Sequence, residues 1–145
     1  MSTAFLETIF CDDVRSEVGH KISHMGVYGS NFLVQDFPAT VPKICVVMLL
    51  HLPEDTAARS AAFSVLRNEE EIGSSTASIE DARRAAMPPR EIGGVRYLAL
   101  RFIAQMSPIL LEGPCRLVAR AKVDGEIVPG GTLLVERVPE GYPIS

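Results

Sequence analysis

Tryptophan is absent from this chain of 145 residues, and tyrosine occurs only three times. Because sugar-binding surfaces usually display aromatic rings, a β-sandwich that binds sugars or other small ligands ranks last among the functions considered. Basic clusters are absent too, and the formal net charge is −4. Nucleic-acid binding needs a positive surface, so we expect no nucleic-acid partner.

Long apolar runs are also missing, since none approaches the roughly 18 residues of a membrane-spanning helix. The N-terminal stretch has no basic region and reaches an acidic residue at Glu7, which is not typical of a secretory signal. The three cysteines, Cys11, Cys45 and Cys115, form no Cys-x-x-Cys pair. Such an odd, widely spaced set fits reduced thiols better than a disulfide framework or a zinc site. We expect a cytoplasmic protein with no membrane partner, no metal and no cofactor.

The sequence does contain one segment, residues 43–52, whose two alternating faces are both apolar, with His51 the exception. A strand that is wet on one face alternates polar with apolar residues, so this segment predicts a strand covered on both sides. Pro42 and Pro53 flank it and set its ends. We expect the rest of the chain to be organised around this strand, in one domain spanning residues 1–145.

The remaining alternating segments predict further strands, and the polar stretch 12–19 between two of them predicts a loop or a single turn. Ser78, with Asp81 three residues later, predicts a capping box before a short helix that Pro88 and Pro89 end. These features predict an all-β, antiparallel two-sheet sandwich of about eight strands with at most one short helix. A partly closed barrel is the alternative. The expected strands are 4–11, 20–29, 32–34, 61–68, 71–78, 95–106, 115–123 with a hairpin turn at 124–125, and 132–138.

Residues 10–29 contain Phe-Cys-Asp-Asp, Gly-x-Lys and Gly-Val-Tyr, and with residues 37–47 they resemble a family of small uncharacterised bacterial proteins. Residues 112–127 are similar to a hairpin with the pattern Gly-x-Tyr-x-Phe of immunoglobulin-like sandwiches, although Pro114 and Cys115 follow Gly113 here. The resemblance implies an immunoglobulin-like sandwich over most of the chain. It implies no catalytic residues, and it favours a phage-related role.

Two groups of residues could carry chemistry. His20 and His24 would share one face of a helix and suit zinc, but on a strand their rings lie roughly 13 Å apart and cannot share an ion. A metal-dependent hydrolase using these histidines with Asp12 and Asp13 stays an alternative. Cys11 or Cys115 could be a nucleophile if a histidine lay within reach. Their places on apolar strand faces favour packing instead.

A cationic stripe on the hairpin at 115–127 is the last candidate. It is either a solvated sheet face or a surface for an acidic partner. Apolar residues on outward faces suggest coverage by a neighbouring subunit. We therefore expect a non-catalytic protein that contacts other protein subunits, including copies of itself, as a self-assembling or phage-related structural component in the cytoplasm or the virion. The candidate contact residues are Arg116, Val118, Arg120, Lys122 and Leu134.

Overall fold

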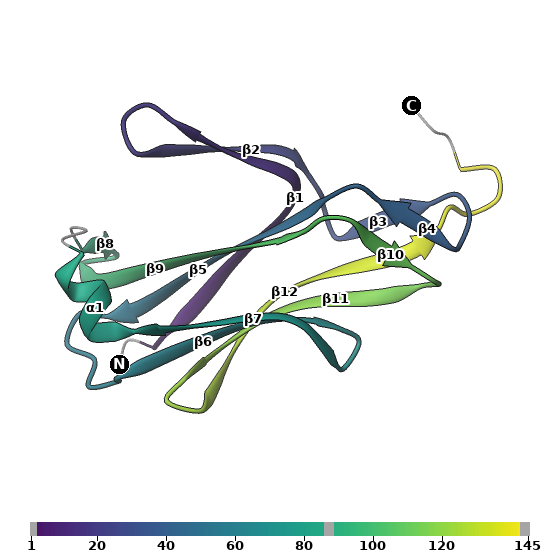
Figure 1. The fold of residues 1–145 in the computed structure, drawn as a ribbon. Coiled ribbons are helices and arrows are strands. Elements are labelled where there is room, and N and C mark those ends of the chain that lie inside the picture. Colours follow the sequence, from purple (N-terminus) through teal and green to yellow (C-terminus); the bar gives the residue numbers. More distant parts are fainter. Residues whose placement is uncertain (1–2, 86–88, 143–145) are drawn as a thin grey trace.

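The structure is a computed structural model that describes residues 3–85 and 89–142. Two five-stranded sheets face one another, and a two-stranded sheet lies at one end (Figure 1). The first sheet has the order β2 (Lys21–Val27), β1 (Phe5–Glu17), β5 (Ile44–Pro53), β9 (Val95–Met106), β8 (Arg90–Ile92). The second has the order β3 (Asn31–Val34), β12 (Glu126–Arg137), β11 (Cys115–Val123), β6 (Ser60–Arg67), β7 (Glu70–Ser78). The two-stranded sheet pairs β10 (Ile109–Leu111) with β4 (Ala39–Val41).

The predicted all-β sandwich with one short helix, α1 (Ile79–Arg84), is confirmed. The number of strands is higher than the eight expected, because β4, β8 and β10 are each three residues long and too short to show alternation. The pairing is antiparallel except between β12 and β3, which run parallel. The prediction of a loop at 12–19 is wrong, since β1 continues to Glu17. Residues 12–17 of β1 are exposed or half-buried, which explains why a strand here carries polar side chains.

The predicted strand at 43–52 is confirmed as β5, which lies at the centre of the first sheet. Its even-numbered residues point into the space between the sheets and meet apolar side chains from the second sheet. Burying each such side chain stabilises the fold by about 1.5–3 kcal/mol. The fully buried residues that form this core include Ile44, Val46, Met48, Leu50, Val65, Leu117 and Leu133.

The opposite face of β5 is buried as well, as its sequence predicts. Cys45 and Val47 form a small cluster with Cys11 of β1, and every apolar side chain packed against this cluster comes from β1. His51 on the same face is fully buried and stacks on Phe5, with ring centroids 4.4 Å apart. Side chains of the first sheet itself therefore cover much of this face.

The two sheets come closest where β12 passes β1 (Figure 1). The backbone N–H of Gly131 donates to Thr8 Oγ1 over 3.0 Å, and the register of β12 on β11 shifts close to this point. A Cβ added to Gly130 would lie 2.6 Å from the carbonyl oxygen of Ala119 and 2.7 Å from Leu6 Cδ2. Glycine is needed here because no side chain fits between the two strands.

Short sequence motifs determine where the hairpin turn at 124–125 and the start of the helix lie. The predicted turn at Asp124 and Gly125 joins β11 to β12, with φ values of 49° and 85°. Positive φ at both positions is the geometry of a tight hairpin turn. Ser78 caps α1 as predicted, since its Oγ accepts from the N–H of Asp81 over 3.3 Å. The helix ends before the predicted stop at Pro88, which lies outside the described residues.

Candidate interaction surface

The first sheet carries a projecting hairpin, residues 12–27, which we call the arm. The ladder between β1 and β5 ends at Cys11 and Cys45, and from there β1 pairs with β2 alone. Figure 1 shows the arm splaying away from β5 and β9. The arm exists because β1 continues for six residues beyond Cys11, whereas β5 begins only at Ile44.

Apolar side chains on the arm are open to solvent. Val18 at the turn is 93% exposed, Val27 is 58% exposed and Met25 is 44% exposed. A two-stranded hairpin in water is at best marginally stable, because it has little apolar surface to bury. An arm of this kind gains stability when another surface covers it.

The outer edge of β2 has no strand partner in the described part of the chain. The pairing of β1 with β2 is interrupted between Asp12 and Gly26, so the alternation of the ladder differs on the two sides of Gly26. On the turn side of this break, Glu17 and Lys21 close a loop of only three residues and form a hydrogen-bonded pair, so the odd-numbered residues of β2 bond to β1 and the N–H and C=O groups of the even-numbered residues point outward. The outward-pointing residues of this part of β2 are Ile22 and His24.

The base of the arm is fixed by Asp12 and Tyr28. The hydroxyl of Tyr28 donates to Asp12 Oδ1 over 2.6 Å. Burial, and then the carboxylate of Asp12, raise the pKa of Tyr28 far above its usual value. Gly26 has a φ of 65°, and a Cβ at this position would overlap the carboxylate of Asp12. Glycine is therefore required where the arm meets the sandwich.

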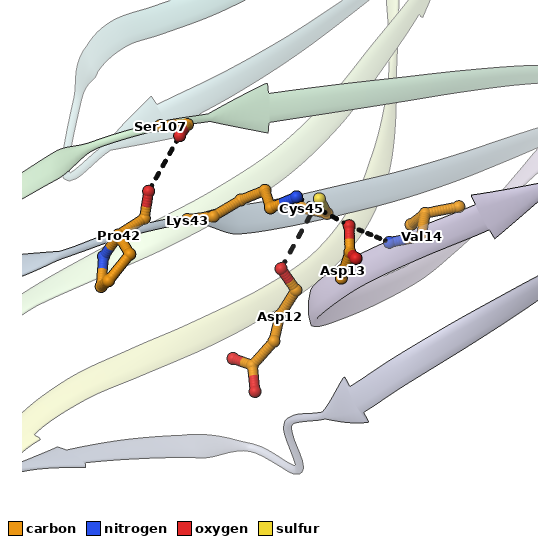
Figure 2. A network of polar contacts seen from close by, with 7 residues as sticks. All are labelled: Asp12, Asp13, Val14, Pro42, Lys43, Cys45 and Ser107. Atoms are coloured by element: carbon orange, nitrogen blue, oxygen red, sulfur yellow. Dashed lines mark hydrogen bonds and ion pairs between the residues drawn. The ribbon is translucent and has the colours of Figure 1, made fainter.

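Asp13 is held by a different partner, Lys43, as Figure 2 shows. Lys43 Nζ lies 2.8 Å from Asp13 Oδ1, and the N–H of Val14 donates to the same oxygen over 2.9 Å. The bond from Lys43 and then the bond from Val14 lower the pKa of Asp13. Asp13 therefore ties the arm to the residue just before β5.

The four residues of the metal-site alternative are not brought together. Asp12 bonds to Tyr28 and Asp13 to Lys43, while His20 lies in the turn of the arm with a φ of 59°. The Nε2 atom of His24 is buried without a hydrogen-bond partner. Across residues 3–85 and 89–142, no three histidine, cysteine or acidic side chains lie close enough to hold a metal ion.

The cationic stripe lies on the outward face of β11, because the alternate residues Leu117 and Ala119 are in the core. Arg116 of β11 pairs with Leu134 of β12, which places these two candidates side by side. The face carries exposed cations and half-buried apolar groups, and the Nε of Arg120 is buried without a partner. The exposed candidates are Arg116 and Lys122, and the half-buried ones are Val118, Arg120 and Leu134.

The sequence does not reveal the arm, because the polar segment 12–19 predicts a loop. Two signals could have identified it. Gly19 favours a hairpin turn, and in the structure Gly19 and His20 both adopt positive φ. The charges of Asp13, Arg15 and Glu17 alternate in the manner of one strand face.

In the described part of the chain, no helix is both long and apolar enough to cross a membrane. A family model described as a family of unknown function (DUF6941) matches residues 7–136. Comparison with curated proteins gave no match, and neither did comparison with solved structures.

Proposed function

The chain belongs to DUF6941, a family of unknown function, and we propose that it is a non-catalytic β-sandwich subunit that assembles with other protein chains. The observation that supports this best is the arm. It combines an unpaired strand edge with three exposed apolar side chains, Val18, Met25 and Val27. Edge strands with free backbone groups are templates for pairing with another chain.

The partner proposed for the arm is the arm of a second copy. An edge strand that pairs antiparallel with its own copy satisfies twofold symmetry, so the same surface serves both subunits. Natural edge strands are usually blocked by lysine, proline or a bulge. Along β2 there is no proline, and Lys21 is its only lysine. Gly26 interrupts the ladder with β1, and the outward N–H and C=O groups of Ile22 and His24 are available to the partner.

The cationic face of β11 is the second proposed contact surface. Arg116 and Lys122 repel the same face of another copy, so this surface suits an acidic patch on a different subunit. We include three further points in this proposal. The fold is related to immunoglobulin-like sandwiches, the protein has a phage-related role, and it is located in the cytoplasm or the virion. Two facing sheets of five strands support the immunoglobulin-like relationship.

Light scattering after size-exclusion chromatography tests assembly through the arm. The average mass of the wild-type protein should rise above 15.7 kDa as concentration increases. The variant Val27→Lys adds a charge to the β2 edge and should stay a monomer at every concentration. Ile127→Lys is a matched control, because Ile127 is also 58% exposed but lies on β12 in the second sheet. A wild-type protein that remains monomeric would disprove arm-to-arm assembly, as would equal assembly by both variants.

A further inference from the structure

Cys11 and Cys45 lie directly opposite one another on neighbouring antiparallel strands. Both are free thiols, and their exposed fractions are 0% and 1%. They are two of the three buried members of one cluster, so their side chains are on the same face of the sheet. The sequence separates them by more than thirty residues, and only the register of β1 on β5 brings them together.

The hydrogen-bond pattern of the sheet shows which kind of pair they form. The bond from Tyr28 N–H to the Phe10 carbonyl directs the backbone groups of Phe10 toward β2, so those of Cys11 point toward β5. The bond from Glu54 N–H to the Arg96 carbonyl directs even-numbered residues of β5 toward β9. The backbone groups of Cys45 therefore point toward β1. Two separate bonds thus make Cys11 and Cys45 a hydrogen-bonded pair.

This pairing sets the distance between the two residues. Cα atoms in a hydrogen-bonded antiparallel pair are about 5.5 Å apart, and disulfides most often join Cα atoms about 5.5–6 Å apart. The Cβ atoms of opposite residues are about 4.5–5.5 Å apart, and those of disulfides about 3.5–4.5 Å. Closing a disulfide therefore requires only a small approach of the two strands, and the bond formed is strained.

We propose that Cys11 and Cys45 form a modification site, in which a small disulfide such as oxidised glutathione converts the two thiols into a cross-strand disulfide. The proposal is independent of the proposed function. The pair lies at the last rung between β1 and β5, where the arm begins. A disulfide here covalently joins the base of the arm to the central strand of the first sheet.

The reaction is two thiol–disulfide exchanges. The thiolate of one cysteine attacks a sulfur of oxidised glutathione, forms a mixed disulfide and releases one reduced glutathione. The thiolate of the second cysteine then attacks the protein sulfur of that mixed disulfide and releases the second reduced glutathione. The protein loses two hydrogen atoms, and one molecule of oxidised glutathione is reduced to two thiols. Because both sulfurs are buried, attack requires transient opening of the ladder end at Cys11.

The reduced state is favoured until an oxidant is present. Burial raises the pKa of Cys11 and of Cys45, which keeps both thiols protonated at neutral pH. The Sγ of Cys45 lies 3.9 Å from the carbonyl of Asp12, at the place where a thiol donates a weak bond (Figure 2). The rate of disulfide formation should rise about tenfold per pH unit below the thiol pKa values, because the thiolate is the nucleophile.

The test uses the full chain with Cys115→Ser, which removes the third thiol on β11. The folded protein is incubated with oxidised glutathione, and intact mass and non-reducing peptide maps are recorded. The expected product has lost two hydrogen atoms, carries no glutathione, and links the peptides that contain Cys11 and Cys45. Dithiothreitol should restore the original mass quickly, because a strained disulfide is easily reduced.

Single variants, Cys11→Ser and Cys45→Ser in the same background, provide the matched controls and should give at most a glutathione adduct. A second incubation in urea reports the chemistry of the unfolded chain. The proposal is overturned if the folded protein keeps both thiols, if it accumulates only glutathione adducts, or if the link forms only in urea. Oxidation of the wild-type chain, which retains Cys115, should give the same Cys11–Cys45 link.

Discussion

The variant Gly130→Ala tests how tightly β12 packs at Gly130 against its neighbour β11 and against β1 of the facing sheet. Gly130 does not have a positive φ, so backbone strain plays no part in the expected effect. The new methyl group would lie 2.6 Å from the Ala119 carbonyl and 2.8 Å from Thr8 Oγ1, and the first of these atoms belongs to the backbone. Overpacking of this kind lowers the free energy of unfolding by about 1–3 kcal/mol.

Urea denaturation measures this loss. With a urea dependence of about 2 kcal/mol per molar, the midpoint should fall by roughly 0.5–1.5 M. Gly73→Ala is the control, because Gly73 is also a strand glycine without positive φ, but nothing lies within 4 Å of its added Cβ. Its midpoint should stay equal or rise slightly, since alanine restricts the unfolded chain. Equal midpoints for both variants would refute the tight packing of Gly130 against β11 and β1.

Two further predictions concern pH and the base of the arm. Burial lowers the pKa of His51, with Glu7 opposing this effect and Arg90 adding to it. The unfolded chain then binds a proton that the folded chain does not, so unfolding free energy should fall as pH drops below about 6.5. His51→Leu should reduce this fall when urea midpoints at about pH 7.5 and about pH 5.5 are compared, and an unchanged difference would exclude His51 as its source. Tyr28→Phe removes the 2.6 Å bond to Asp12 and should cost about 1 kcal/mol. Hydrogen exchange should then become faster at the backbone amides of the arm but not at those of β5. Equal acceleration in both places would contradict a local effect of the substitution.

Strands with strong patterns could be predicted from the sequence. Residues 43–52 are apolar on both faces, and such a run has few alternatives to a central strand. Asp124 and Gly125 encode a turn that needs positive φ at two successive residues. In both cases a few neighbouring residues determine the structure, so no long-range information is needed.

The candidate site could not be predicted, because it depends on contacts between distant segments. The arm exists because β1 is longer than its partner β5, and the polar residues 12–17 look like a loop when that pairing is unknown. The strand at 132–138 was expected to be separate, but β12 runs from Glu126 to Arg137 through the irregularity near Gly130. The approach of Cys11 to Cys45 likewise follows from strand register, which alternation alone does not fix.

Hydrogen exchange of the arm at low and high protein concentration tests assembly most directly. In the monomer, the amides of Ser23 and Met25 bond to β1, whereas those of Ile22 and His24 point outward. Strand pairing between two arms predicts that Ile22 and His24 become protected as concentration rises, with little change at Ser23 and Met25. Exchange at Ile22 and His24 that is fast and independent of concentration would contradict the account.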